Sequence, residues 1–178
     1  RIYIVQARPE TVHSRITTTK SLTRYIISTQ ETLTPLITGL SIGQHIVHGV
    51  VRIITSVNEM HTIQRGEILV TPMTDPDWLP AMRQAAGIIT DRGGRTCHAA
   101  IVSRELAIPA LVGTHNATAE LTNGQRITLD CSQGEKGYVY QDFVPFETQV
   151  ISYNELPQAP VDIMINLADP DKAFLASF

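Results

Sequence analysis

Between residues 40 and 140, apolar positions occur in short runs separated by Gly, Pro, Asn and Asp, a pattern typical of buried β-strands. The runs rich in Val and Ile lie at 45–54, 67–71, 88–90, 110–112, 127–131 and 138–140. The segment from Gly134 to Gly137 separates the last two runs, which predicts a hairpin there. The central part of the chain is therefore expected to contain a β-sheet.

Two segments between these strands show a helical pattern. Residues 74–77 combine capping residues with a proline, which predicts a helix start. Farther along, Ala99, Val102 and Leu106 have the spacing of one apolar helix face. These strands and helices together describe an α/β fold, with a compact mixed sheet and flanking helices.

A loop with two glycines precedes the second helix and places a histidine at its start. Residues 92–95 read Arg-Gly-Gly-Arg. Thr96 is then expected to cap the helix by accepting from the N–H of Ala99, so that His98 occupies the second helical position. The free N–H groups and the dipole at a helix N-terminus favour a bound anion there.

His98 is suited to carrying a phosphoryl group on physical grounds. A neutral imidazole is a nucleophile at physiological pH, and the phosphoramidate that it forms can pass its phosphoryl group onward. Gly93 and Gly94 leave room for a phosphate to approach the backbone, and the charges of Arg92 and Arg95 suit a transferring phosphoryl group. These residues alone predict an anion site with a nucleophile, without identifying a reaction.

Other polar combinations point less clearly to chemistry. His45 and His48 are three residues apart in a predicted strand, so they face opposite sides and make a poor zinc site. Cys97 beside His98 suggests a Cys–His dyad, but neighbours on a helix point about 100° apart. Cys97 is therefore expected to pack inward, and no metal site is predicted.

Composition mainly excludes classes of function. The chain has 178 residues, 43% of them hydrophobic and 17% charged, which is typical of globular proteins. Its net charge of -3, without a basic run, disfavours a nucleic-acid partner. No apolar run is long enough for a membrane span, and only two cysteines are present, which favours a cytoplasmic location over a disulfide framework.

Residues 94–104, Gly-Arg-Thr-Cys-His-Ala-Ala-Ile-Val-Ser-Arg, resemble the phosphohistidine signature of the phosphoenolpyruvate-utilising enzymes. Within this family, residues 71–78, 123–125 and 134–140 are also similar to the phosphoenolpyruvate synthases (pyruvate, water dikinases). Cys97 favours that group over the pyruvate phosphate dikinases, in which a serine is expected at this place. The resemblance implies a β/β/α swivelling domain with partial segments of the flanking domains.

The resemblance also implies roles for individual residues. His98 would accept a phosphoryl group from ATP and pass it to pyruvate, so that ATP, pyruvate and water give AMP, phosphoenolpyruvate and phosphate. Gln6 and Arg8 match positions that contact ATP, and Thr96 matches a regulatory site of a bifunctional kinase/phosphorylase. Mg²⁺ is expected in the full-length enzyme, with its ligands outside this chain and no cofactor bound by these residues.

By the same resemblance, the chain divides into five segments. These are the tail of an ATP-binding domain (1–10), a linker with one strand (11–39), the phosphohistidine swivelling domain (40–140), a second linker (141–160) and the start of a phosphoenolpyruvate- or pyruvate-binding barrel (161–178). Fully extended, the second linker would reach roughly 65 Å. The partners are then the ATP-binding and pyruvate-binding domains of the same polypeptide, of which this chain is expected to be a piece.

Two alternatives remain open. The chain can belong to a pyruvate phosphate dikinase or an antibiotic-phosphorylating relative, since the acceptor site is expected outside it. It can also be a non-catalytic swivelling interaction module, in which His98 is never phosphorylated and its replacement leaves the activity of the host protein intact.

Overall fold

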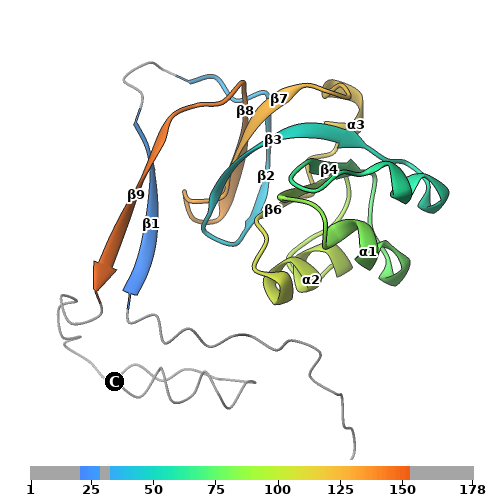
Figure 1. Ribbon diagram of the computed structural model, residues 1–178, viewed down its shortest axis with the longest axis horizontal. Coiled ribbons are helices and arrows are strands. Elements are labelled where there is room, and N and C mark those ends of the chain that lie inside the picture. Colours follow the sequence, from blue (N-terminus) through green and yellow to red (C-terminus); the bar gives the residue numbers. More distant parts are fainter. Residues whose placement is uncertain (1–20, 29–32, 153–178) are drawn as a thin grey trace, which may run out of the picture.

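A closed β-barrel forms the centre of the molecule in the computed structural model, which describes residues 21–28 and 33–152 (Figure 1). Its strands and those of a separate ribbon are β1 (Ser21–Ile27), β2 (Ile37–Ile42), β3 (Ile46–Ile53), β4 (Ile68–Thr71), β5 (Gly87–Thr90), β6 (Ala110–Val112), β7 (Arg126–Asp130), β8 (Lys136–Gln141) and β9 (Phe146–Ser152). The α-helices are α1 (Leu79–Met82), α2 (His98–Leu106) and α3 (Ala117–Glu120), and the 3-10 helices are η1 (Val57–Thr62) and η2 (Pro76–Trp78).

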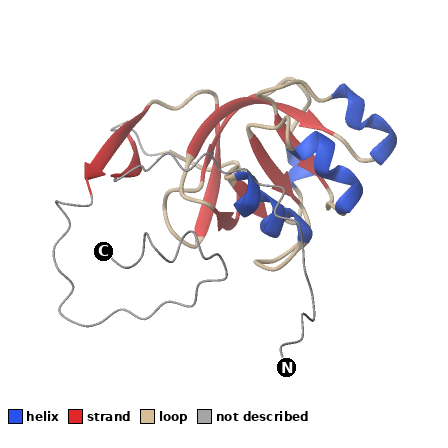
Figure 2. Ribbon diagram, turned by 60° about the horizontal axis from the view of Figure 1, so that its bottom comes forward, coloured by secondary structure: helices blue, strands red, loops and turns tan. Residues whose placement is uncertain are grey.

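The barrel is parallel on one side and antiparallel on the other. Its strand order is β2-β6-β5-β4-β3-β7-β8, and the pairs β3–β4, β4–β5 and β5–β6 are parallel. Parallel neighbours need crossover connections. Here η1 connects β3 to β4, η2 and α1 connect β4 to β5, and α2 connects β5 to β6. These helices therefore gather on the parallel side of the barrel (Figure 2).

Two apolar clusters stabilise this arrangement, one inside the barrel and one between the barrel and its helices. The inner cluster includes Ile68, Val70, Ile89, Leu111, Ile127 and Leu129. The outer cluster includes Leu69, Trp78, Met82, Ile88, Ala99 and Val102, with Leu106 packed against it. β4 and β5 are thus buried on both faces, which explains their uninterrupted apolar runs. The predicted apolar face of the second helix is confirmed.

A pair of glycines lets the barrel close between β2 and β8. Gly39 and Gly137 lie opposite each other in this antiparallel pair. A Cβ on Gly137 would lie 2.6 Å from Leu111 Cδ1, and a Cβ on Gly39 would lie 3.0 Å from Leu111 Cγ. Larger residues would therefore displace the leucine that fills the barrel at this point.

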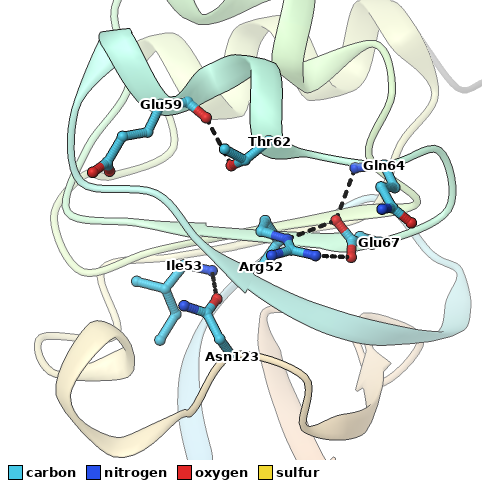
Figure 3. A network of polar contacts seen from close by, with 7 residues as sticks. All are labelled: Arg52, Ile53, Glu59, Thr62, Gln64, Glu67 and Asn123. Carbon is cyan, nitrogen blue, oxygen red and sulfur yellow. Dashed lines mark hydrogen bonds and ion pairs between the residues drawn. The ribbon is translucent and has the colours of Figure 1, made fainter.

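An ion pair links β3 to the segment that enters β4 (Figure 3). Arg52 donates from Nε and Nη2 to the two carboxylate oxygens of Glu67, at 2.9 and 2.7 Å. The amide of Gln64 donates to the same carboxylate, at 2.8 Å. The hydrogen bonds from Arg52 lower the pKa of Glu67 below its ordinary value. On the other side of β3, Asn123 Oδ1 accepts from the Ile53 amide at 2.6 Å.

The ribbon lies outside the barrel and consists of β1 and β9 (Figure 1). The two strands pair antiparallel from Ser21 opposite Ser152 to Ile27 opposite Phe146. β1 falls in the segment predicted as a linker with one strand, whereas β9 falls in the second predicted linker, where no strand was expected. The division into domains itself stays a prediction.

The predicted α/β class and mixed sheet are confirmed, with two additions. Sequence patterns did not indicate β2, which starts three residues before the predicted domain boundary at 40, or the short helix α3. In the described residues, no helix is both long and apolar enough to cross a membrane. The predicted nucleotide contacts Gln6 and Arg8, and the predicted segments 1–10 and 161–178, lie outside the described residues.

Candidate active site

His98 lies where two crossover connections meet, above the C-terminal ends of β4 and β5. It is the first residue of α2 and is half-buried. Its Nδ1 atom lies 3.0 Å from the hydroxyl oxygen of Thr74, which follows β4 and is only 7% exposed. This contact fixes the imidazole ring through one nitrogen. In α/β sheets, the carboxyl ends of adjacent parallel strands are a common place for ligands.

The predicted capping role of Thr96 is wrong. The N-cap of α2 is Cys97, which makes no side-chain cap hydrogen bond, and Thr96 is exposed one residue earlier. The Cys97 amide donates to the Gly94 carbonyl at 3.1 Å, so residues 94–97 form a turn of their own and the helix begins later than expected. His98 is therefore the first and not the second helical residue. Without a side-chain cap, the N–H groups of the first turn remain available to an anion.

The glycine loop is packed closely against its surroundings. Gly93 has a φ of 128°, and a Cβ there would lie 2.7 Å from Cys97 Sγ. A Cβ on Gly113 would lie 2.8 Å from the Gly93 carbonyl oxygen. The loop therefore requires glycine at these two positions, whereas a Cβ on Gly94 would meet nothing within 4 Å. Cys97 packs against the outer apolar cluster, as predicted.

Asp91, which was not among the predicted site residues, joins the base of this loop to a second element. Its carboxylate accepts from the amide of Thr118 at 3.0 Å and from the hydroxyl of the same residue in α3. Its own amide donates to Thr71 at the end of β4, at 3.2 Å. A capping residue two positions before Gly-Gly was the available signal. Thr74 offered none, because it lies 24 residues before His98.

The two loop arginines differ in their surroundings. Arg95 pairs with Glu135 in the turn between β7 and β8, at 3.1 Å, and its carbonyl accepts from Arg104 at 2.8 Å. Arg95, Arg104 and Glu135 line an open groove of about 450 Å³ that does not include His98. Arg92 is exposed, and its amide donates to Pro72 at 2.9 Å, which ties the loop to the segment before Thr74.

His45 and His48 contact aromatic rings. The His45 ring packs edge-on against Tyr25, with ring centroids 5.3 Å apart, and His48 stacks on Phe143 at 4.9 Å. Across residues 21–28 and 33–152, no group of three or more His, Cys, Asp or Glu side chains could hold a metal ion.

Comparisons with known proteins identify relatives of this chain. Residues 63–134, which include Thr74 and His98, match the family described as PEP-utilising enzyme, mobile domain. A phosphoenolpyruvate synthase of Deinococcus radiodurans is 48% identical over 174 residues, which is 98% of this chain and 22% of the relative. The phosphoenolpyruvate synthase of Escherichia coli is 44% identical over 174 residues, covering 98% of this chain and 21% of the relative.

A solution structure of Enzyme I is 29% identical over 45% of this chain and 33% of that chain, with a TM-score of 0.38. The chain spans about one fifth of the length of the curated synthases that it matches. The family match over the histidine loop and the identity along nearly the whole chain lead to one assignment. The chain belongs to the phosphoenolpyruvate-utilising enzymes and contains their mobile domain.

Proposed function

We propose that this chain is the phosphohistidine domain of a phosphoenolpyruvate synthase and that His98 carries a phosphoryl group from ATP to pyruvate. The observation that carries the proposal is the position of the imidazole. His98 begins a nine-residue helix without a side-chain cap, and Thr74 binds one ring nitrogen. The other nitrogen, Nε2, is then the nucleophile, and the amides at the start of α2 suit phosphoryl oxygens.

The contact with Thr74 fits one tautomer of the neutral ring. When Nδ1 carries the proton and donates it to the Thr74 hydroxyl oxygen, the lone pair of Nε2 is free to attack. A bond then forms between Nε2 and the β-phosphorus of ATP, while the bond from that phosphorus to the oxygen of the leaving AMP breaks. The transferred group contains the β- and γ-phosphorus atoms, and water then hydrolyses the bond between them and releases the γ-phosphate as inorganic phosphate. Loss of a methyl proton to a base of the pyruvate-binding domain gives the enolate of pyruvate. The enolate oxygen then takes the remaining phosphoryl group as the bond between Nε2 and phosphorus breaks, and His98 returns to its neutral state.

The partners of this cycle are the ATP-binding and pyruvate-binding domains of the same polypeptide. Mg²⁺ belongs to those domains in the proposal, and no step here uses it. Both cysteines of the described residues, Cys97 and Cys131, are free thiols, which suits the reducing cytoplasm. Thr96 is exposed two residues before His98 and is proposed as the target of a regulatory kinase/phosphorylase.

Isotopic labelling of the full-length protein tests the proposal. ATP labelled in the β-phosphate should leave an acid-labile, base-stable label on His98, and a chase with pyruvate should move that label into phosphoenolpyruvate. His98→Asn should abolish both. ATP labelled in the γ-phosphate should release its label as inorganic phosphate. Label that persists in the Asn variant, or normal turnover by that variant, would contradict the proposal and favour the non-catalytic module.

A further inference from the structure

The two chain segments that enter and leave the barrel are paired with each other. β1 and β9 form seven successive antiparallel pairs. The Ser28 amide donates to the Pro145 carbonyl at 3.0 Å and extends this ladder toward the barrel. At the far end, Ser21 lies opposite Ser152, so the two connections to the rest of the polypeptide begin about 5 Å apart.

An aromatic cluster attaches the ribbon to the barrel. Residues directly opposite in an antiparallel pair share a face, so Tyr25, Thr148, Ile27 and Phe146 lie on one side of the ribbon. Tyr25 contacts His45, with ring centroids 5.3 Å apart, and Phe146 contacts His48 at 4.9 Å. An isolated two-stranded ribbon is marginal in water. We call these four rings, Tyr25, His45, His48 and Phe146, the aromatic clamp.

The connection between β8 and β9 is bonded to the barrel. Asp142 donates from its amide to Arg126 at 2.9 Å and accepts from the Thr128 hydroxyl at 2.7 Å. The amide of Val144 donates to the same hydroxyl at 2.8 Å, and its carbonyl lies 2.7 Å from His48 Nε2. Val144 is only 7% exposed. Bending at this connection would break these bonds, so it is a poor place for a hinge.

We propose that the β1–β9 ribbon is a stalk that stays paired and clamped to the barrel while His98 moves between its two sites. This inference rests on the proposed function. The barrel and the ribbon would then turn as one body, with Ser21 and Ser152 paired at its end.

The stalk changes the reach available to His98. Residues 146–152 belong to the ribbon, so the segment 141–160 does not act as one extended chain. In its place, the ribbon contributes a lever of about 20 Å, from six steps of about 3.4 Å each. Figure 1 shows the ribbon on the side of the barrel away from α1 and α2. Rotation about the ribbon tip would therefore carry α2, which begins at His98, through a wide arc.

Disulfide bonds across the ribbon test the stalk in the full-length protein. Thr23 lies opposite Val150, and Arg24 lies opposite Gln149. Closely and widely spaced pairs alternate along an antiparallel ladder, and both spacings suit a disulfide. We therefore expect Thr23→Cys with Val150→Cys, and Arg24→Cys with Gln149→Cys, to cross-link on oxidation. The oxidised enzyme should keep its turnover and its labelling of His98 within about twofold of the reduced form.

The four single-cysteine variants are the matched controls, and they should not respond to the oxidant. Burial raises the pKa of the Cys131 thiol to about 12, so this native cysteine should not compete for the new disulfides. A tenfold or greater loss of turnover on oxidation, restored by a reductant, would show that the strands must separate and would overturn the stalk. Failure of both pairs to cross-link would overturn the pairing itself.

The reduced variants keep this test separate from the proposed function. If the reduced enzymes do not label His98, the proposed carrier role is wrong, and this result does not depend on whether the ribbon stays paired. Hydrogen exchange then checks the clamp. The amides of β1 and β9 and those of Asp142 and Val144 should stay equally protected with ATP or with phosphoenolpyruvate bound. Loss of their protection in either state would place a pivot at or within the ribbon and contradict the proposal.

Discussion

At the scale of single residues, His98 acts as a nucleophile only through the ring nitrogen that the protein leaves free. Thr74 occupies Nδ1, and its buried side chain follows a different strand from the one before the histidine. No spacing in the sequence brings these residues together. The contact depends on the register of parallel β4 and β5, where Thr71 lies beside Thr90.

Thr74→Val removes the hydroxyl while nearly keeping the shape of the side chain. We expect labelling of His98 to slow about tenfold, because a net hydrogen bond of roughly 1 to 1.5 kcal/mol orients the ring and selects its tautomer. Single-turnover labelling measures the change, and the KM for ATP should stay constant. Thr74→Ser is the control and should restore most of the rate. Equal rates in the Val and Ser variants would contradict this role.

Thr96 illustrates why helix caps are difficult to assign from sequence. Thr precedes the helix, but the turn from Gly94 to Cys97 shifts the helix start and leaves the hydroxyl in solvent. Thr96→Val should therefore keep the labelling rate within about twofold, whereas loss of a true cap costs about 1 kcal/mol. Thr96→Glu should suppress labelling at least tenfold, because it places a negative charge beside the incoming phosphoryl group. Undiminished labelling of the Glu variant would count against regulation at this residue.

At the scale of elements, the strands buried on both faces were predictable from their apolar runs, whereas β2 was not. β4 and β5 lie between the two apolar clusters and show continuous apolar runs. β2 reads Ile-Thr-Gly-Leu-Ser-Ile, in which glycine and two hydroxyl residues interrupt the pattern. Its glycine is needed for close packing on Leu111, a constraint that appears only when the barrel closes.

The ion pair between β3 and β4 predicts a pH-dependent stability. Because Arg52 lowers the pKa of folded Glu67 below 4.5, the carboxylate stabilises the fold above that pH and loses its contribution as the pH falls through the lowered pKa. Glu67→Gln should weaken the protection of amides in β3 and β4 at pH 7 by about 1–3 kcal/mol. Hydrogen exchange, corrected for intrinsic rates, measures the difference.

That difference should shrink as the pH falls below about 4.5, since Glu67 of the opened chain then binds a proton, and it should vanish once the pH has fallen through the lowered pKa of folded Glu67. Glu59→Gln is the control, because the Glu59 side chain lies exposed in the neighbouring helix η1 (Figure 3). It should leave the protection unchanged at every pH. A constant difference between wild type and Glu67→Gln down to pH 3 would contradict the assigned cause.

At the scale of the whole molecule, the barrel must close before His98 has a stable support. Gly39 and Gly137 allow β2 and β8 to meet over Leu111. Gly137→Ala should therefore reduce the protection of amides in both strands by about 1–3 kcal/mol, the usual cost of overpacking. Gly94→Ala is the control and should leave that protection unchanged, since its Cβ meets nothing within 4 Å. Equal protection in the two variants would show that closure tolerates a larger residue.

The whole molecule then joins a rigid barrel, a clamped ribbon and one exposed ring nitrogen. Each part serves the carrier role only if the phosphoryl group is bound to the free side of the imidazole. The nitrogen that carries phosphorus therefore tests the account most directly. In the full-length protein, labelled with ¹⁵N-histidine and treated with ATP, nitrogen–phosphorus coupling in the NMR spectrum identifies that atom. The account predicts phosphorus on Nε2 of His98, with Nδ1 protonated toward Thr74. Phosphorus on Nδ1, or on no histidine at all, would contradict it.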